Sequence, residues 1–498
     1  MADHFLALDI GTQSARAAIL DADGEILGIA QVVHDVDSPH QGWAQQKPND
    51  WWQETCQAIR DVLAQTDMAA ESIAAIGTCG QMHGPVGIDR NGKVTTESVQ
   101  LWCDKRCQPQ VEAVIAQHDE TRLAAIAGSS INPAWSGLKI RWHKDNQPEV
   151  YEKSEQFLVP KDFINYRLTE VAAADPSEAS GSFLWDCQRN EYSTQLADAV
   201  EVDIAKLAPV HASHEVIGAI VPSVAELTGL RAGTPVVAGG GDFPVSMLGF
   251  GIVGQGVTAD VTGTSTLLAA HSPEPLVDPA IQNLRHVVDG WIPFTILDCG
   301  GLSMKWCKDL VSDMCGRDVS YDELIERASE AAVGSDGLVF FPYMLGERRR
   351  ENTTSRGGYF GLNLNHSAPH MVRAVMEGVA FAMGKDVSIF RERGLNVERI
   401  FSVGGGTRNK LWNRIKADVT HSTLELSDEP EAGLKGAALL AATGVGLIDD
   451  PVQVAVDRRA KTQTVEPDPD AAAAYADLQT EFVRIYDHML GFWLENES

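Results

Sequence analysis

The sequence has few basic residues for its length, and this shortage excludes several classes of partner. It contains 40 Lys and Arg residues against 69 Asp and Glu residues, which gives a formal net charge of −29 at pH 7. Surfaces that bind nucleic acids or anionic membranes need clustered Lys and Arg side chains, so we expect neither partner. The acidity does not exclude a local anion site built from backbone N–H groups.

Long apolar runs and paired cysteines are also missing. No stretch approaches the roughly 20 apolar residues of a membrane span, and residues 1–8 lack the basic start and apolar run of a signal peptide. The eight cysteines show no paired CxxC spacing. We therefore expect buried free thiols in a reducing, cytoplasmic compartment. The 498 residues, 44% of them hydrophobic, predict a globular chain of about two to four domains.

The commonest nucleotide-binding motifs are absent as well. No GxxxxGK[ST] sequence occurs. Gly249–Gly254 matches GxGxxG, but we expect a helix before it and a strand after it. The dinucleotide fingerprint requires the opposite order, so this match is a decoy.

Strands and helices alternate along the chain, which is typical of an α/β protein. Phe5–Ile10 and Ala15–Leu20 are predicted to form a β-hairpin, and a helix is expected over 48–65. Residues 258–269 repeat the hairpin pattern about half a chain later. This repeat favours two similar halves that meet near residues 249–255, although so short an echo can arise by chance.

Both predicted hairpins turn through a Gly-Thr sequence. Such a turn can direct backbone N–H groups and hydroxyls at one point, which suits a phosphate. Asp9 precedes the first turn. Its carboxylate can hold Mg²⁺, since Mg²⁺ prefers oxygen ligands and keeps several waters. An ordinary hairpin turn is the alternative.

A carboxylate follows a run of glycines in the middle of the chain. Val236–Gly241 is predicted as a buried strand that ends in three glycines, and Asp242 comes next. A carboxylate in this place can accept a proton from a substrate hydroxyl. A turn residue or a helix N-cap is the alternative, because Pro244 stands at a helix-start position.

Two further loops follow predicted strands. Gly404–Asn409 lies between a strand over 399–403 and a helix over 410–421, and its glycines can admit an adenine or ribose. A tight strand-to-helix turn is the alternative. Gly80–Gly84 follows a strand over 72–79 and places Gln and His at the strand end, where α/β proteins bind ligands. A structural His is the alternative there.

Taken in order, these segments resemble the FGGY family of carbohydrate kinases. The resemblance covers nearly the whole chain and rests on Leu8–Ser14, Gly80–Gly84, Leu101–Cys107, Pro160–Asp162, Gly239–Asp242, Gly263–Ser265, Pro342–Arg348, Phe360–Leu362 and Gly404–Gly406. It implies two ribonuclease-H-like α/β domains of the actin, sugar kinase and heat-shock ATPase superfamily, over 1–250 and 251–498. It also implies an active site in the cleft between them.

The resemblance assigns roles to individual residues. Asp242 matches the catalytic base, and Asp9 matches the acid that would hold Mg²⁺, directly or through water. The residues that fall at ATP contacts are Thr12, Gln13, Ser14, Gly263, Thr264, Ser265, Gly301, Lys305, Gly405, Gly406 and Asn409. The residues that match or adjoin the sugar site are Gln81, Met82, His83, Trp102, Asp104, Asp242 and Phe243.

The resemblance is strongest to the D-xylulose kinases of the family, and it implies ATP-dependent formation of D-xylulose 5-phosphate. Two departures leave the sugar open. These kinases commonly carry Asn after the catalytic Asp, whereas Phe243 offers no hydrogen bond to a sugar. The usual Gly-Glu-Arg-Thr-Pro run appears here as Gly346–Asn352, with arginines at 348–350 that have no assigned role.

Other functions stay open. Ribulose, erythritol and glycerol are alternative substrates, although glycerol kinases carry Arg-Glu where this chain has Met82 and His83. An actin-like ATP-binding module without sugar turnover is an alternative of another class, and the acid at Asp242 favours catalysis over it. Members of the family are commonly dimers. By this resemblance we expect a homodimer for this chain.

Overall fold

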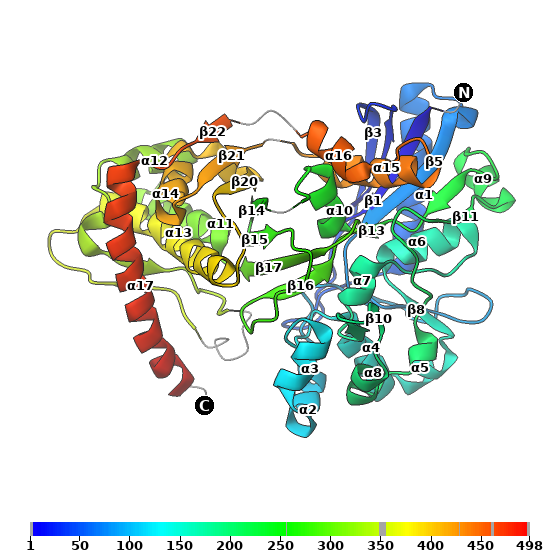
Figure 1. Cartoon of the computed structure of the whole chain (residues 1–498), viewed down its shortest axis with the longest axis horizontal. Helices are drawn as coiled ribbons and strands as arrows, with labels where there is room; N and C mark the ends of the chain where they lie inside the picture. Colours follow the sequence, from blue (N-terminus) through cyan, green and yellow to red (C-terminus); the bar gives the residue numbers. More distant parts are fainter. Residues whose placement is uncertain (1–2, 255, 348–354, 428, 460–462, 496–498) are drawn as a thin grey trace. The chain divides into compact units, whose positions relative to one another are not determined.

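The computed structural model describes residues 3–254, 256–347, 355–427, 429–459 and 463–495. The chain divides into two compact units, whose elements are labelled in Figure 1. The first unit contains residues 1–253, 273–292 and 431–459. The second contains residues 254–272, 293–430 and 460–498.

The first unit is built on a mixed sheet with the strand order β11-β12-β5-β1-β2-β3, and β13 also pairs with β5. The strands are β1 His4–Ile10, β2 Ser14–Leu20, β3 Ile26–Val33, β5 Ile73–Gly80, β11 Val216–Ala219, β12 Pro235–Val237 and β13 Gly240–Gly241. β1, β2 and β3 form an antiparallel meander, whereas β5 runs parallel to β1. The predicted first hairpin is therefore confirmed.

Alternate residues of β1 enter two separate cores. Leu6, Leu8 and Ile10 belong to one buried cluster, while Phe5 and Ala7 belong to another. A strand that is buried on both faces has apolar residues at successive positions, and this explains the continuous apolar run of β1 from Phe5 to Leu8.

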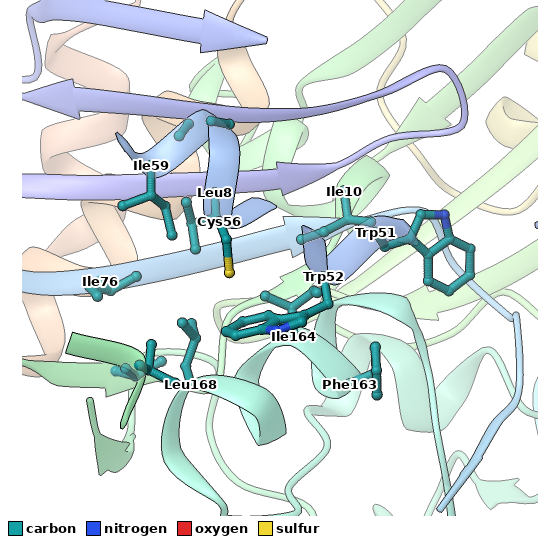
Figure 2. Close-up of a cluster of buried hydrophobic side chains, with 14 of the residues drawn as sticks. Leu8, Ile10, Trp51, Trp52, Cys56, Ile59, Ile76, Phe163, Ile164 and Leu168 are labelled. Atoms are coloured by element: carbon teal, nitrogen blue, oxygen red, sulfur yellow. The ribbon is translucent and has the colours of Figure 1, made fainter. Parts of the chain in front are cut away.

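Helix α1 (Pro48–Thr66) covers the face that carries Leu8 and Ile10. Its proline lies at the start of the helix, where the missing N–H costs nothing. Figure 2 shows Trp52, Cys56 and Ile59 of this helix packed with strand residues and with α6 (Pro160–Thr169). The other helices of this unit are α2 Gln108–Gln117, α3 Glu120–Ala127, α4 Ser136–Asn146, α5 Pro148–Lys153, α7 Pro176–Ser180, α8 Thr194–Val200, α9 Pro222–Thr228, α10 Asp242–Gly249, α15 Ala432–Gly444 and α16 Pro451–Asp457.

The second unit repeats the pattern of the first. The strands β17 Trp291–Leu297, β15 Thr266–Ala270, β14 Thr258–Thr262, β20 Arg399–Val403, β21 Thr423–Leu426 and β22 Gln463–Val465 neighbour one another in that order. β17, β15 and β14 are antiparallel, and β20 and β21 then run parallel to β14. Its helices are α11 Gly300–Cys315, α12 Tyr321–Ser329, α13 Ala368–Glu392, α14 Lys410–Thr420 and α17 Pro469–Glu495. The echo between the two hairpins thus reflects two similar α/β sheets.

The units differ from the predicted halves in their later segments. The chain leaves the first unit at residue 253, close to the predicted boundary of 250, but residues 273–292 and 431–459 return to it. Helix α15, drawn in orange in Figure 1, packs against β1 and β5. Gly77 allows this close approach, because a Cβ there would lie 1.9 Å from the Ala437 carbonyl oxygen. An almost wholly apolar helix needs cover on most sides, and the sheet supplies it.

The cysteines mostly follow the prediction. All eight are free thiols, and six are buried, whereas Cys103 and Cys315 are exposed. Burial raises the pKa of the Cys56 thiol to about 11 and that of Cys107 to about 12, so these thiols are neutral. None of the described helices is long and apolar enough to cross a membrane.

Candidate active site

The first candidate phosphate turn, residues 11–13 between β1 and β2, lies next to an ion pair between a carboxylate and an arginine. Asp9 is the next-to-last residue of β1 and lies directly opposite Arg16 of β2. The Arg16 guanidinium donates from Nε to Asp9 Oδ2 at 3.1 Å and pairs through Nη1 with Glu431 Oε2 at 2.7 Å. Asp9 Oδ1 is buried without a hydrogen-bond partner in the protein. An unsatisfied buried carboxylate oxygen is costly, and a bound ligand or ion would satisfy it.

The turn itself is fixed by side chains from three other segments. Gln46 donates from Nε2 to the Thr12 carbonyl oxygen at 2.8 Å, and its Oε1 accepts from Gln81 Nε2 at 2.9 Å. The Trp102 indole donates to Thr12 Oγ1 at 3.2 Å. Gln13 is exposed, whereas Ser14 is buried and its carbonyl oxygen accepts from the Gly11 N–H at 2.9 Å. The turn is thus rigid, with its tip open to solvent.

Asp242 is the first residue of α10. The single strand predicted over 236–241 is broken in the structure, because β12 ends at Val237 and β13 contains only Gly240 and Gly241. The segment Gly239–Gly241, which carries β13, is called the glycine strand. Gly241 is the N-cap and makes no side-chain cap, so the predicted N-cap alternative for Asp242 is wrong. Burial and the nearby Asp9 carboxylate raise the pKa of Asp242 to about 7. A carboxyl group whose pKa lies near the working pH is suited to general base catalysis.

The glycines before Asp242 are required by close packing. Gly239 has φ of +71°, and a Cβ there would lie 2.0 Å from the Thr78 carbonyl oxygen. A Cβ on Gly241 would lie 2.6 Å from the sulfur of Met82. Met82 therefore packs against Gly241, the residue before Asp242, although 159 positions separate Met82 from Gly241 in the sequence.

His83 adopts an unusual backbone conformation beside Met82. Its φ is +72°, a left-handed value that costs free energy in a residue with a side chain. Its Nδ1 lies 3.0 Å from the Gly181 carbonyl oxygen, and its ring packs edge-on against Trp135. The carbonyl requires Nδ1 to carry the proton, so in the neutral ring Nε2 carries the lone pair.

Asp104 and Gln81, two predicted sugar contacts, bond to other groups of the protein. The Asp104 carboxylate is buried and accepts from the Ala44 N–H at 2.7 Å and from the Arg106 guanidinium at 2.7–3.0 Å. Gln81 is also buried, and its amide bonds to Gln46 and Thr12. The protein groups that contact these two side chains give each a structural role, and their predicted sugar contacts stay a prediction.

The second candidate phosphate turn collects three segments of the second unit. Gly263 and Thr264 are exposed at the end of β14. Gly301 lies against this turn, because a Cβ there would be 1.9 Å from the Gly263 carbonyl oxygen. Leu302 donates its N–H to the Thr264 carbonyl oxygen at 2.9 Å, which sets the N-terminus of α11 beside the turn. Helix N-termini favour anions.

The glycine loop after β20 packs on the same hairpin. Gly404 has φ of +91°, and a Cβ there would lie 2.6 Å from the Thr262 carbonyl oxygen. Gly405 and Gly406 follow in a 3-10 turn. Asn409 caps α14, because its side-chain oxygen accepts a hydrogen bond from the Trp412 N–H at 2.9 Å. The sequence predicted an adenosine contact for Asn409 but not this structural role.

Other predicted residues of the second unit are less closely placed. Ser265 ends the turn, and its carbonyl oxygen accepts from the Gly263 N–H at 2.9 Å. Lys305 is exposed on α11 and pairs with Asp309 at 2.6 Å, so nothing fixes it on the turn. Asp260, which stands in the second hairpin sequence where Asp9 stands in the first, is buried and pairs with Lys416 at 2.7 Å. Arginines 348–350 lie outside the described residues.

Family models match both parts of the chain. The N-terminal domain of the FGGY family of carbohydrate kinases matches residues 4–249, and the C-terminal domain of that family matches residues 259–445. The chain therefore belongs to the FGGY family of carbohydrate kinases.

Individual relatives point in the same direction. Xylulose kinase from Bacillus subtilis is 27% identical over 97% of each chain, and xylulose kinase from Escherichia coli is 28% identical over 98% of this chain and 99% of the relative. A crystal structure of xylulose kinase from Rhodospirillum rubrum superposes with a TM-score of 0.92 at 28% identity over 98% of this chain and 99% of the other. Plasmodium falciparum glycerol kinase with ADP, at 19% identity and TM-score 0.87, shares the fold over 97% of both chains.

Proposed function

We propose that this carbohydrate kinase transfers the γ-phosphate of ATP to a hydroxyl of a ketopentose, with D-xylulose as the first candidate and its 5-phosphate as product. The observation that carries the proposal is Asp242, a carboxyl group whose pKa is raised to about 7 by burial and by the nearby Asp9 carboxylate. The relatives named xylulose kinase, which align over nearly the whole chain, support the choice of sugar.

Asp242 would act as the general base. Its carboxylate takes the proton from the sugar hydroxyl while the hydroxyl oxygen forms a bond to the γ-phosphorus, and the bond from that phosphorus to the bridging oxygen of ADP breaks. Its place in the first turn of α10 helps to keep the anionic form available at neutral pH.

Met82, His83 and Trp102 would orient the sugar. Met82 presents an apolar surface, and Nε2 of His83 can accept a hydrogen bond from a sugar hydroxyl. Trp102 contributes its half-buried ring, already fixed by Thr12. Phe243 follows Asp242 and is half-buried, so the acceptor sugar meets an aromatic face there.

ATP would be held by the two turns and the glycine loop. The candidate contacts are Thr12 and Gln13 in the first unit, and Gly263, Thr264, Gly301, Gly405 and Gly406 in the second. Backbone N–H groups and hydroxyls dominate this set, so a chain of charge −29 can bind an anionic nucleotide.

Asp9 fits a Mg²⁺ ion. Its Oδ1 is a buried, unpartnered carboxylate oxygen. Among the residues in the described ranges, no group of three metal-ligating side chains occurs. Mg²⁺ commonly binds through one or two carboxylates together with phosphates and water, so a site with one carboxylate of the chain can hold it. When bound, the ion would neutralise phosphate charge.

The test is an ADP-release assay over a panel of ketoses and polyols, including D-xylulose, ribulose, erythritol and glycerol. We expect the largest kcat/KM with D-xylulose, and Asp242→Ala should abolish sugar-dependent ADP release while ATP still binds. Fast turnover of a polyol without turnover of D-xylulose would contradict the proposed sugar. Near-normal activity of Asp242→Ala would contradict the assignment of Asp242 as the base. No sugar-dependent ADP release by the wild-type protein with any acceptor would instead favour a regulatory module.

A homodimer and a cytoplasmic location belong to the same proposal. The homodimer rests on likeness to the family, and the location rests on the eight free cysteines. Sedimentation of the purified chain tests the first.

A further inference from the structure

A buried lysine in the first unit has no place in the chemistry described above. Lys161 belongs to the segment Pro160–Asp162, and its side chain is fully buried. Its Nζ pairs with Asp175 Oδ1 at 2.9 Å and with the Asp162 carboxylate, and it donates to the Ala238 carbonyl oxygen at 3.0 Å. Burying a charged group is costly, so this arrangement has to be well satisfied to persist.

The same network reaches the residue before Asp242. Ser177 Oγ donates to Asp175 Oδ2 at 2.6 Å and accepts from the Gly241 N–H at 3.0 Å. The chain of contacts therefore runs from the Ala238 carbonyl through Lys161, Asp175 and Ser177 to the Gly241 N–H. It closes a ring around Gly239 and Gly240.

Neighbouring groups fasten the same backbone. Asn165 Nδ2 donates to the Ala238 carbonyl oxygen at 2.8 Å, and its Oδ1 accepts from Thr78 Oγ1 at 2.9 Å. The Gly239 N–H donates to the Ser213 carbonyl oxygen at 2.8 Å. Glycine is the most flexible residue and has no side chain to anchor it, so the place of the next residue depends on such outside contacts.

We propose that Lys161, Asp175 and Ser177 are positioning residues that set the place of the Asp242 carboxylate by clamping the glycine strand at both ends. The proposal rests on the proposed function, in which Asp242 is the base. A displacement of about 1 Å in a catalytic group can cost about a hundredfold in rate. Contacts that fix the backbone next to Asp242 therefore affect the rate of the reaction as well as the stability of the fold.

The chain offers a matched pair of variants to test the clamp. Ser177 and Ser213 both donate a hydroxyl to Asp175 Oδ2, at 2.6 and 3.1 Å, and both are buried. Only the Ser177 hydroxyl also accepts from the Gly241 N–H. Ser177→Ala and Ser213→Ala thus remove the same bond to Asp175, while only the first releases the glycine strand.

The assay measures kcat, KM for ATP and the thermal unfolding midpoint, with whichever sugar the wild-type protein turns over fastest. We expect Ser177→Ala to lower kcat roughly tenfold to a hundredfold with KM for ATP within about twofold of wild type. Ser213→Ala should keep kcat within about twofold of the wild-type value, while its unfolding midpoint should fall by about as much as that of Ser177→Ala. If Ser177→Ala does not fold, Ser177→Cys serves instead, because its sulfur is only a weak acceptor.

Equal kcat values for the two serine variants would overturn the clamp, as would a fall in kcat that only follows the unfolding midpoint. A best sugar other than D-xylulose contradicts the proposed substrate but leaves this comparison intact. The two failures are therefore distinguishable.

Discussion

Asp242 is a carboxylic acid whose chemistry is set by what surrounds it. Burial is the larger cause of its raised pKa, and the negative charge of Asp9 adds to it. The anion must be present for base catalysis, so the rate depends on pH across the neutral range.

We therefore expect kcat/KM for the sugar to fall as the pH drops below about 7, because Asp242 becomes protonated. Asp9→Asn removes the nearby negative charge and should move this acidic limb to lower pH, by roughly half a unit to one unit, in addition to lowering kcat. Initial rates between pH 5.5 and 9 test this. An acidic limb that stays in place in Asp9→Asn would show that the two carboxylates do not interact.

Phe243 is the residue most directly tied to the choice of sugar. Phe243→Asn adds a hydrogen-bonding group beside the base, and one bond is worth about 1 kcal/mol. We expect the kcat/KM of this variant for D-xylulose to be roughly fivefold higher than that of the wild-type protein. An acceptor with one hydroxyl fewer, assayed in parallel, should show no such rise. Phe243→Leu is the control, and it should give no such gain. Lower activity on every sugar would mean that the aromatic ring itself binds the substrate.

At the scale of elements, the second unit gathers its candidate nucleotide contacts by packing a glycine loop on a hairpin. Gly404 lies where a Cβ would meet the backbone of Thr262. Gly394 has a similar φ, +86°, in the same unit, but nothing lies within 4 Å of the place of its Cβ.

Gly404→Ala should raise KM for ATP several-fold, because the loop must move away from the hairpin. Gly394→Ala also places a side chain on a residue with positive φ, but without the collision, so its KM for ATP should stay near the wild-type value while its stability falls. Steady-state kinetics with calorimetry of nucleotide binding check both variants. Equal KM values would indicate that the loop does not contribute to the ATP site.

The hairpins were predictable because their signals are local. Two short apolar strands and a Gly-Thr turn lie within about 15 residues, and the structure confirms both hairpins. Gln46 was missed, since it fastens the Thr12 turn from 34 positions away and carries no local pattern. Asp104 was predicted as a sugar contact, and its bonds to Arg106 and Ala44 were missed, because this pairing depends on the folded backbone.

At the scale of the whole molecule, the two sheets were foreseen but the path of the chain between the units was not. Helix α15 lies in the last quarter of the sequence and still covers the sheet of the first unit. The apolar sequence of this helix predicts that it is buried, but it does not predict against which sheet the helix packs.

A fragment of residues 1–253 lacks α15 and leaves the apolar face of β1 and β5 uncovered. We expect this fragment to aggregate or to remain partly unfolded, as judged by circular dichroism and size-exclusion chromatography. Joining residues 431–459 to it through a flexible linker should improve its solubility. A stable, monomeric 1–253 fragment would show that the sheet does not need this helix.

The return of α15 also bears on how such a protein can change over generations. A unit that occupies one uninterrupted stretch of a gene can be exchanged by a single recombination event. Here a crossover near residue 253 would join one sheet to a covering helix that had been selected on another. New sugar preferences are therefore expected to arise by point substitution around Asp242, at positions such as Phe243, rather than by trading whole halves between relatives.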